Sequence, residues 1–276
     1  MNPRILMAIA KKDLLEVRQN KAAWMPMVIV PIVFIVLFPL LIIVLPQLSS
    51  QAAEQLVNDP DMAMMFERLP AVIMDKVTGL NAMQSIVVMM LGYFFAPMFL
   101  IFPLMFSTTV AAESFAGERE RKTMEALLYT PASNAELFFG KMLAGLIPAL
   151  LISWLSFLLY AIVLNAAGWP LFGYIWFPLE TWYPLIFWVT PALAVMGVGM
   201  TVLISSKVQT FMGAYQASAS LVIVVVGLML GQFAGVVYLS VGVGMLIGLL
   251  AWIIAGVMVF VSFQNFNRAK LLVSSN

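Results

Sequence analysis

Apolar residues fill long, continuous stretches of the chain, and charged residues are confined to the gaps between them. No Asp, Glu, Lys or Arg occurs in 22–53, 77–112, 142–179, 181–206 or 208–267. A membrane core about 30 Å thick needs roughly 20 apolar residues of helix. The first four stretches therefore each fit one membrane span, and the fifth fits two. Continuous apolar runs favour helices over the alternating pattern of a membrane β-barrel.

The pattern thus predicts an all-α membrane protein, a single transmembrane domain over residues 1–276. The expected spans are 24–46, 83–107, 140–164, 184–205, 211–231 and 241–263. Small residues recur every four positions near the last two spans: Gly227, Gly231 and Gly235, then Ser240, Gly244 and Gly248. Such rows allow helices to approach closely, so we expect them to pack the last two spans against each other or against their neighbours. A seam between two copies of the protein is the alternative.

Composition supports the membrane assignment and removes several chemistries. The chain is 63% hydrophobic and 10% charged, with a mean hydropathy of +1.02, far from the composition of soluble proteins. It has no Cys and no His, which excludes thiol catalysis, haem ligation by His and ordinary zinc sites. The 21 Met residues could suit Cu(I), but they are scattered through the spans, which favours packing. We therefore expect no metal site.

Basic residues set the expected orientation. Twelve of the 14 basic residues fall on one side of a six-span topology: Arg4, Lys11, Lys12, Arg18, Lys21, Arg119, Arg121, Lys122, Lys141, Lys207, Arg268 and Lys270. The other side holds only Arg68 and Lys76. The positive-inside rule places the twelve in the cytoplasm. We therefore expect cytoplasmic termini in a cell (inner or plasma) membrane.

The first 22 residues predict an amphipathic helix. Leu6, Ala10, Leu14 and Val17 share one stripe, and basic residues occupy much of the remaining surface. Such helices lie along membrane surfaces, and we expect this one at the inner surface. The alternative is that the basic residues of this segment serve only to fix the orientation of the first span.

Residues 108–139 are expected to form a folded cytoplasmic elbow. Gly117 is predicted to break the chain before a short helix from about Glu118 to Tyr129. In that helix Glu118 with Lys122, and Arg121 with Glu125, stand four residues apart. Met124, Leu127 and Leu128 form an apolar ridge, and Pro131 stops the helix. Ser133 and Glu136 then form a capping box that starts the next helix. Spacing alone leaves two readings open, docking to a partner or lying on the membrane surface.

The segment 166–188 on the other side is rich in aromatic residues, with four of the seven Trp. An aromatic belt at the membrane interface explains this composition. A substrate exit lined by aromatic rings is the alternative.

Missing motifs narrow the function further. There is no GxxxxGK[ST] phosphate-binding loop, so we expect no ATP hydrolysis by this chain and classify it as a non-enzyme. An ion-coupled secondary transporter is the main alternative, but no span has an ionisable residue near its centre. An intramembrane enzyme has only serine chemistry left, and no Gly-x-Ser-x-Gly elbow is present.

The residues from Glu113 to Lys141, with GERERKTMEALL at 117–128 followed by Pro131, Ser133 and Glu136, resemble the signature of the type-2 ABC exporter permeases. The six spans, the N-terminal helix and the short C-terminal tail extend the resemblance to nearly the whole chain. It implies a permease that dimerises with a second copy or a paralogue in membrane lipid. It also implies two cytoplasmic ATPase subunits that carry ATP–Mg, with no nucleic acid partner and no cofactor in this chain. The residues it assigns to ATPase coupling are Glu113, Glu118, Arg119, Glu120, Arg121, Lys122, Glu125, Leu127, Leu128 and Pro131. Substrate does not follow from it.

Overall fold

The computed structural model describes residues 1–67, 71–121, 123, 130–208 and 210–266. Every regular element in these ranges is helical. Six helices are long and apolar enough to cross a membrane: Ala23–Leu48, Ala82–Glu120, Asn134–Phe172, Trp182–Ser205, Phe211–Phe233 and Val241–Asn265. Each predicted span lies inside one of them. We number these helices as spans 1 to 6 along the chain.

The spans are assembled from shorter elements, many of them interrupted by π-helical turns. Helix α1 (Pro3–Gln19) precedes span 1, which comprises α2 (Lys21–Ile32), η1 (Val33–Leu37) and α3 (Phe38–Leu48). Helices α4 (Ser50–Val57), α5 (Pro60–Glu67) and α6 (Ala71–Val77) connect it to span 2. Span 2 comprises α7 (Ala82–Val87), η2 (Val88–Phe94), α8 (Ala96–Phe99), α9 (Ile101–Ala112), η3 (Glu113–Gly117) and α10 (Glu118–Glu120). The remaining spans are α12 (Asn134–Phe172), α13 (Trp182–Pro184) with η4 (Leu185–Val189) and α14 (Thr190–Ser205), α15 (Phe211–Ala219) with α16 (Val222–Phe233), and α17 (Val241–Asn265).

Spans 2 and 4 form the centre of the protein. In the most apolar stretch of each span, 83% of span 2 and 72% of span 4 is buried, against 22% in each of the other four. The other four spans therefore leave most of these stretches unburied by the rest of the chain, free to face lipid or another subunit. Any movement of span 2 would be felt by the whole bundle.

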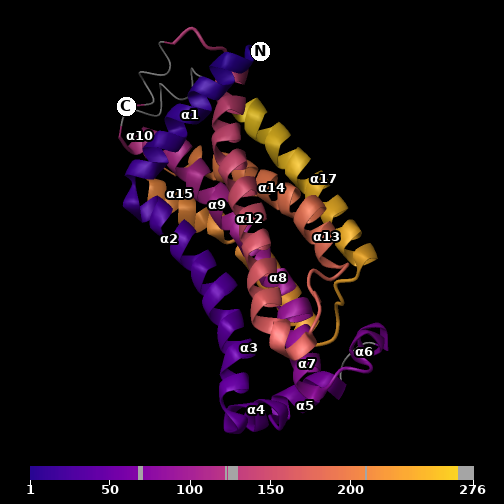
Figure 1. Cartoon of the computed structure of the whole chain (residues 1–276). Helices are drawn as coiled ribbons and strands as arrows, with labels where there is room; N and C mark the ends of the chain where they lie inside the picture. Colours follow the sequence, from indigo (N-terminus) through magenta and orange to yellow (C-terminus); the bar gives the residue numbers. More distant parts are fainter. Residues whose placement is uncertain (68–70, 122, 124–129, 209, 267–276) are drawn as a thin grey trace.

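Two ends of the bundle can be distinguished (Figure 1). Helices α1 and α10 lie at one end, and α4, α5 and α6 lie at the other. Phe266, just after α17, packs with Ile9 of α1 and Leu137 of α12, so the beginning and the end of the described chain meet. We call the end with α1, η3, α10 and the first turns of α12 the charged end, and the opposite one the distal end.

Span 2 is interrupted in its distal half by the π-helix η2. Three consecutive carbonyls there each accept a hydrogen bond from another span: Leu91 O from Tyr160 Oη at 2.8 Å, Gly92 O from Trp182 Nε1 at 2.6 Å, and Tyr93 O from Gln232 Nε2 at 2.9 Å. A π-helical turn frees carbonyls from the regular helical ladder. In a membrane interior these groups must find partners within the protein, and spans 3, 4 and 5 supply them.

The predicted glycine rows have different outcomes. A Cβ added at Gly227 would meet no described atom within 4 Å, and one added at Gly231 would lie 3.3 Å from Val237 Cγ2 in the connection after span 5. Gly235 takes the left-handed backbone (φ 73°) that ends span 5. Cβ atoms added at Gly227 and Gly231 would meet only Val237 among the described residues, so this row packs no two spans of the single chain together, and a seam between two copies of the protein stays a prediction. Gly244 and Gly248 do pack closely, against Pro184 and Trp188 of span 4, as expected for small residues facing a neighbouring span.

The contact between the two central spans predicts a large effect for one methyl group. A Cβ on Gly197 would lie 2.3 Å from Ser107 Oγ and 3.3 Å from Thr108 Cγ2. We expect Gly197→Ala to lower the free energy of unfolding by about 1–3 kcal/mol, as overpacking does in dense interiors. The measurement is thermal unfolding of the purified protein in detergent.

Gly256→Ala is the matched control, because Gly256 lies in span 6 and a Cβ added there would meet no described atom within 4 Å. We expect it to be neutral or slightly stabilising, since Ala favours helix. Equal stability of the two variants would contradict the close contact between spans 2 and 4.

Candidate functional site

The charged end is built on α1, which packs along the beginning of α12 rather than standing apart. Its inward face carries Ile9, Ala10, Asp13 and Val17, all buried. The apolar stripe expected from the sequence is therefore used against the protein itself. Met7 and Leu15 remain exposed on the other face, 56% and 51% respectively. The helix thus covers the chain and still offers a mixed basic and apolar surface outward.

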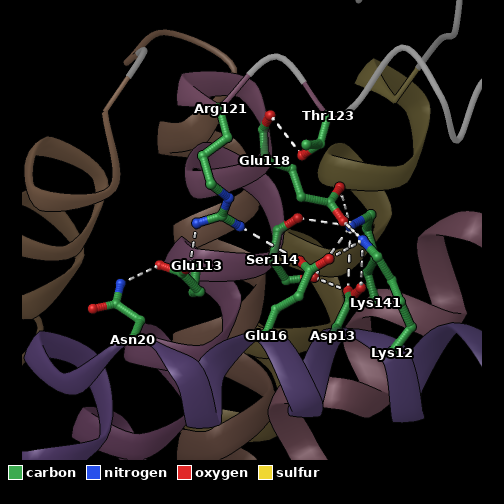
Figure 2. A network of polar contacts seen from close by, with 10 residues as sticks. All are labelled: Lys12, Asp13, Glu16, Asn20, Glu113, Ser114, Glu118, Arg121, Thr123 and Lys141. Atoms are coloured by element: carbon green, nitrogen blue, oxygen red, sulfur yellow. Dashed lines mark hydrogen bonds and ion pairs between the residues drawn. The ribbon is translucent and has the colours of Figure 1, made fainter.

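Lys141 is the buried centre of a group of charges that joins three helices (Figure 2). Its side chain is 1% exposed. Its Nζ lies 2.6 Å from Glu118 Oε2, 3.2 Å from Asp13 Oδ2 and 2.7 Å from the carbonyl of Ser114. The Ser114 hydroxyl also donates to Asp13. A buried ion pair of this kind needs further hydrogen bonds to its groups; Ser114 supplies them to Lys141 and to Asp13 Oδ2, while Asp13 Oδ1 has no hydrogen bond within the described chain.

Lys12 and Glu16 extend this group toward solvent. The Lys12 ammonium pairs with Glu118 and lies 2.9 Å from Glu16 Oε1 and 3.4 Å from Asp13 Oδ1. Burial lowers the pKa of Lys12, but its hydrogen bonds to Glu118 and Glu16 and the nearby carboxylate charges outweigh this, and the net pKa is raised. A cation whose pKa rises on folding adds stability below its unfolded pKa of about 10.4 and loses it only as the pH climbs through the folded value. These contacts therefore persist at neutral pH.

A second arm centres on Glu113, whose side chain is 2% exposed. Arg121 donates to Glu113 Oε1 and lies 3.4 Å from Glu16 Oε2, while Asn20 Nδ2 donates to Glu113 Oε2 at 2.9 Å. Burial lowers the pKa of Arg121, and the bond to Glu113 raises it, with a net upward shift. We call Lys12, Asp13, Glu16, Asn20, Glu113, Ser114, Glu118, Arg121 and Lys141 the charged cluster.

Arg119 and Glu120 tie the same end to spans 4 and 5. The Arg119 guanidinium donates to the carbonyl of Ser205, the last residue of α14. Glu120 Oε2 accepts from the backbone N–H of Phe211 at 2.8 Å, at the first turn of α15. A carboxylate at a helix N-terminus is stabilised by the unpaired N–H groups and by the helix dipole.

The predicted capping box is present at the start of α12. Ser133 Oγ accepts from Glu136 N at 3.2 Å, and Glu136 Oε2 accepts from Ser133 N at 2.9 Å. The other carboxylate oxygen accepts from Asn2 N at 2.8 Å. One side chain therefore fixes the start of span 3 and the start of α1 together.

One local expectation for this region is wrong, and a second falls largely outside the described residues. Gly117 does not break the chain, because its backbone is helical (φ −62°, ψ −40°) and span 2 continues to Glu120. Of the predicted helix 118–129, the structure describes a helical turn over Glu118–Glu120, a turn at Arg121 and a non-helical Thr123, while 122 and 124–129 lie outside the described residues, so the rest of that helix stays a prediction. Thr123 closes the end by donating from N and Oγ1 to the Glu118 carbonyl. Arg121 pairs with Glu113 and Glu16 of other turns and helices.

The structure places the sequence-predicted site residues in different settings. Glu113 and Glu118 are buried, Arg119 is half-buried, and Glu120, Arg121 and Pro131 are exposed. Lys122, Glu125, Leu127 and Leu128 lie outside the described residues. Sequence reasoning assigned no site role to Asp13, Ser114 and Lys141. One signal was available, because Asp13 interrupts the apolar stripe formed by Ile9, Ala10 and Val17 and an acid on a buried face needs a partner.

The carboxylates of Asp13, Glu16 and Glu118 approach one another within 4.8 Å, close enough to share a cation. The ammonium groups of Lys12 and Lys141 lie among them. The protein therefore supplies its own counter-ions here, and the arrangement serves as a structural junction.

These observations define a class: a helical, multi-pass membrane protein with an ion-paired junction at one end of its second span. The particular family follows from comparison with known proteins. The ABC-2 family transporter protein model matches residues 7–273, and the chain belongs to this family. It is the membrane permease component of an ABC-2 type transporter, a non-catalytic subunit, and the ion-coupled alternative is set aside. No curated protein matches the chain, and no solved structure does.

Proposed function

We propose that this permease serves an ATP-driven exporter. Two copies, or one copy and a paralogue, would form the translocation path in the cell membrane, with two ATPase subunits bound at the charged end. Nine of the twelve basic residues assigned to the cytoplasm lie within the described chain (Arg4, Lys11, Lys12, Arg18, Lys21, Arg119, Arg121, Lys141 and Lys207), and together with the sequence pattern they support a cytoplasmic placement of that end, with both termini inside. ATP–Mg would be held by the partner subunits.

One observation carries the proposal. The charged cluster joins α1, span 2 and span 3 through buried charges, directly beside the segment that follows α10. A docked ATPase that moved this segment would move the end of span 2 with it, because breaking the buried pairs costs more than shifting them as a unit. Since span 2 is central, such a motion would reach the whole bundle.

The proposed roles of the site residues follow from their settings. Glu113 and Glu118 position the segment from inside and make no contact with the ATPase. Arg119 and Glu120 hold the segment to spans 4 and 5. Contact with the ATPase is proposed for the residues that follow: Arg121, Lys122, Glu125, Leu127, Leu128 and Pro131.

Charge reversal tests this assignment. We expect Glu125→Lys to reduce copurification of the co-expressed ATPase by about tenfold, as loss of a desolvated charge contact does at interfaces. The permease itself should keep its thermal stability. Glu54→Lys is the matched control, since Glu54 is exposed in α4 at the distal end. Unchanged copurification and ATPase activity in Glu125→Lys would refute the docking assignment.

A further inference from the structure

A cavity of about 480 Å³ with a mixed polar and apolar lining lies at the distal end, away from the charged cluster. Its lining comes from α6, η2, the segment before α13 and the connection from α16 to α17, and includes Lys76, Tyr93, Glu180, Thr181, Tyr238 and Val241. This volume is within the range of small-molecule sites, roughly 300–1,000 Å³. The cavity therefore has room for a small ligand or for the headgroup of a lipid.

One cation and one anion face each other at the cavity. Lys76 Nζ lies 3.9 Å from Glu180 Oε2, with side chains 56% and 80% exposed. An exposed pair of this kind contributes only about 0–1 kcal/mol. A ligand that carries both charges can therefore separate the pair at little cost and satisfy each member.

Two tyrosines line the cavity with Glu180: Tyr238 is partly exposed, and Tyr93, 3% exposed, packs against it. The rings of Tyr93 and Tyr238 are 5.9 Å apart and tilted by 46°. Tyr93 belongs to η2, whose carbonyls are held by Trp182 and Gln232. π-helical turns often occur at functional sites because they redirect side chains. An ammonium group is attracted both by aromatic faces and by a carboxylate. The Thr181 hydroxyl has no hydrogen-bond partner among the described residues.

We propose that this cavity binds a small zwitterionic group, with its ammonium at Glu180 and the Tyr238 ring and its phosphate or carboxylate at Lys76. A lipid headgroup and a free zwitterionic solute share this chemistry. Val241 at the cavity is 44% exposed, and the next turn of α17 exposes Met245 and Leu246. A lipid can therefore enter from the side, with its chains along α17. The proposal is independent of ATPase docking.

Lipid retention tests the site without any ATPase. The purified permease is reconstituted in nanodiscs with equal amounts of phosphatidylethanolamine and phosphatidylglycerol, and retained lipids are counted by native mass spectrometry. We expect wild type to retain phosphatidylethanolamine preferentially. Glu180→Gln should lower that retention about threefold, the value of one exposed charge and cation–π contact, and should not lower retention of anionic phosphatidylglycerol. Glu54→Gln, the same change at another exposed distal carboxylate, should have no effect.

The direction of the effect discriminates between ligand classes. If Glu180→Gln raises retention of both lipids, the cavity is an anion site and the proposal is wrong. Unchanged phosphatidylethanolamine retention in Glu180→Gln also overturns it. Soluble glycerophosphoethanolamine then distinguishes a lipid headgroup from a free zwitterionic solute as the ligand. If it displaces bound phosphatidylethanolamine, the site also accepts free zwitterions. If it does not, the site is specific for the lipid. Either result keeps the zwitterion site, and thermal unfolding confirms that the variants are folded.

Discussion

Lys141→Met is expected to lower the free energy of unfolding by about 3–5 kcal/mol, the usual effect of removing one partner from a buried ion pair. The substitution leaves the carboxylates of Asp13 and Glu118, both with fully buried side chains, without their central cation. The hydrophobic stem of Met replaces that of Lys, so the loss is electrostatic. Thermal unfolding in detergent measures it, and protease access to α1 shows whether the helix has detached.

Lys11→Met provides the control, because Lys11 is exposed on the same helix and its removal changes the net charge equally. We expect it to stay within about 0.5 kcal/mol of wild type. Adding Glu118→Gln to Lys141→Met should recover part of the loss, since it removes one of the two buried carboxylates that Lys12 would then have to balance without Lys141. Equal stability of the two single variants would show that Lys141 is not a structural centre.

Trp182→Ala is expected to cost about 3–5 kcal/mol, as removal of a fully buried large aromatic does. Trp182 is 0% exposed and packs on Phe99, Phe157, Tyr160 and Phe177. Trp182→Phe keeps much of that packing but leaves the Gly92 carbonyl without its donor. Its expected cost is about 1–3 kcal/mol, the desolvation penalty of an unpaired buried group.

Trp169→Phe is the matched substitution, because Trp169 is 56% exposed in the distal part of α12. It should change stability by less than about 0.5 kcal/mol. If Trp182→Phe behaved like Trp169→Phe, the hydrogen bond to Gly92 would not hold η2 in place. Both are read from the same thermal unfolding experiment.

The fold was predictable where local sequence carries the cause. Charge-free stretches of sufficient length define six spans, and Ser133 with Glu136 marks the start of span 3 in agreement with the observed capping box. The π-helix η2 was not predictable in the same way. Its carbonyls depend on Tyr160, Trp182 and Gln232, donors that lie 69 to 139 residues away, and no local pattern reports such pairings.

The aromatic residues of 166–188 fall into two groups, one exposed and one buried in the core. Trp169, Tyr174, Tyr183 and Phe187 are about half exposed or more, as an interfacial belt requires. Phe172, Trp176, Phe177 and Trp182 are buried in the core. Periodicity alone could not divide them, because this segment changes direction between α12 and α13.

Gly117 illustrates how a correct observation led to a wrong local structure. Glycine often breaks a helix, and the sequence therefore predicts a break at Gly117. In the structure a Cβ at this position would lie 3.0 Å from Glu113 Oε2 and 3.3 Å from Arg121 Nη1. Because Gly117 has no side chain, the ion pair between Glu113 and Arg121 fits beside it. Likewise, Lys12 and Glu118 are 106 residues apart, beyond any rule based on helical spacing.

Cross-linking tests the central claim, that an ATPase docks beside the charged cluster, most directly. The chain has no Cys, so single cysteines can be placed in an otherwise inert background. Thr123→Cys is exposed just after α10, and Val236→Cys, at a position 80% exposed between α16 and α17, marks the distal end. Each is labelled with a benzophenone maleimide and irradiated in membranes that contain the co-expressed ATPase. We predict a cross-linked product from position 123 in which mass spectrometry identifies the ATPase by its phosphate-binding-loop sequence. We predict no such product from position 236. An ATPase product from position 236 alone, or from neither position, would contradict the account.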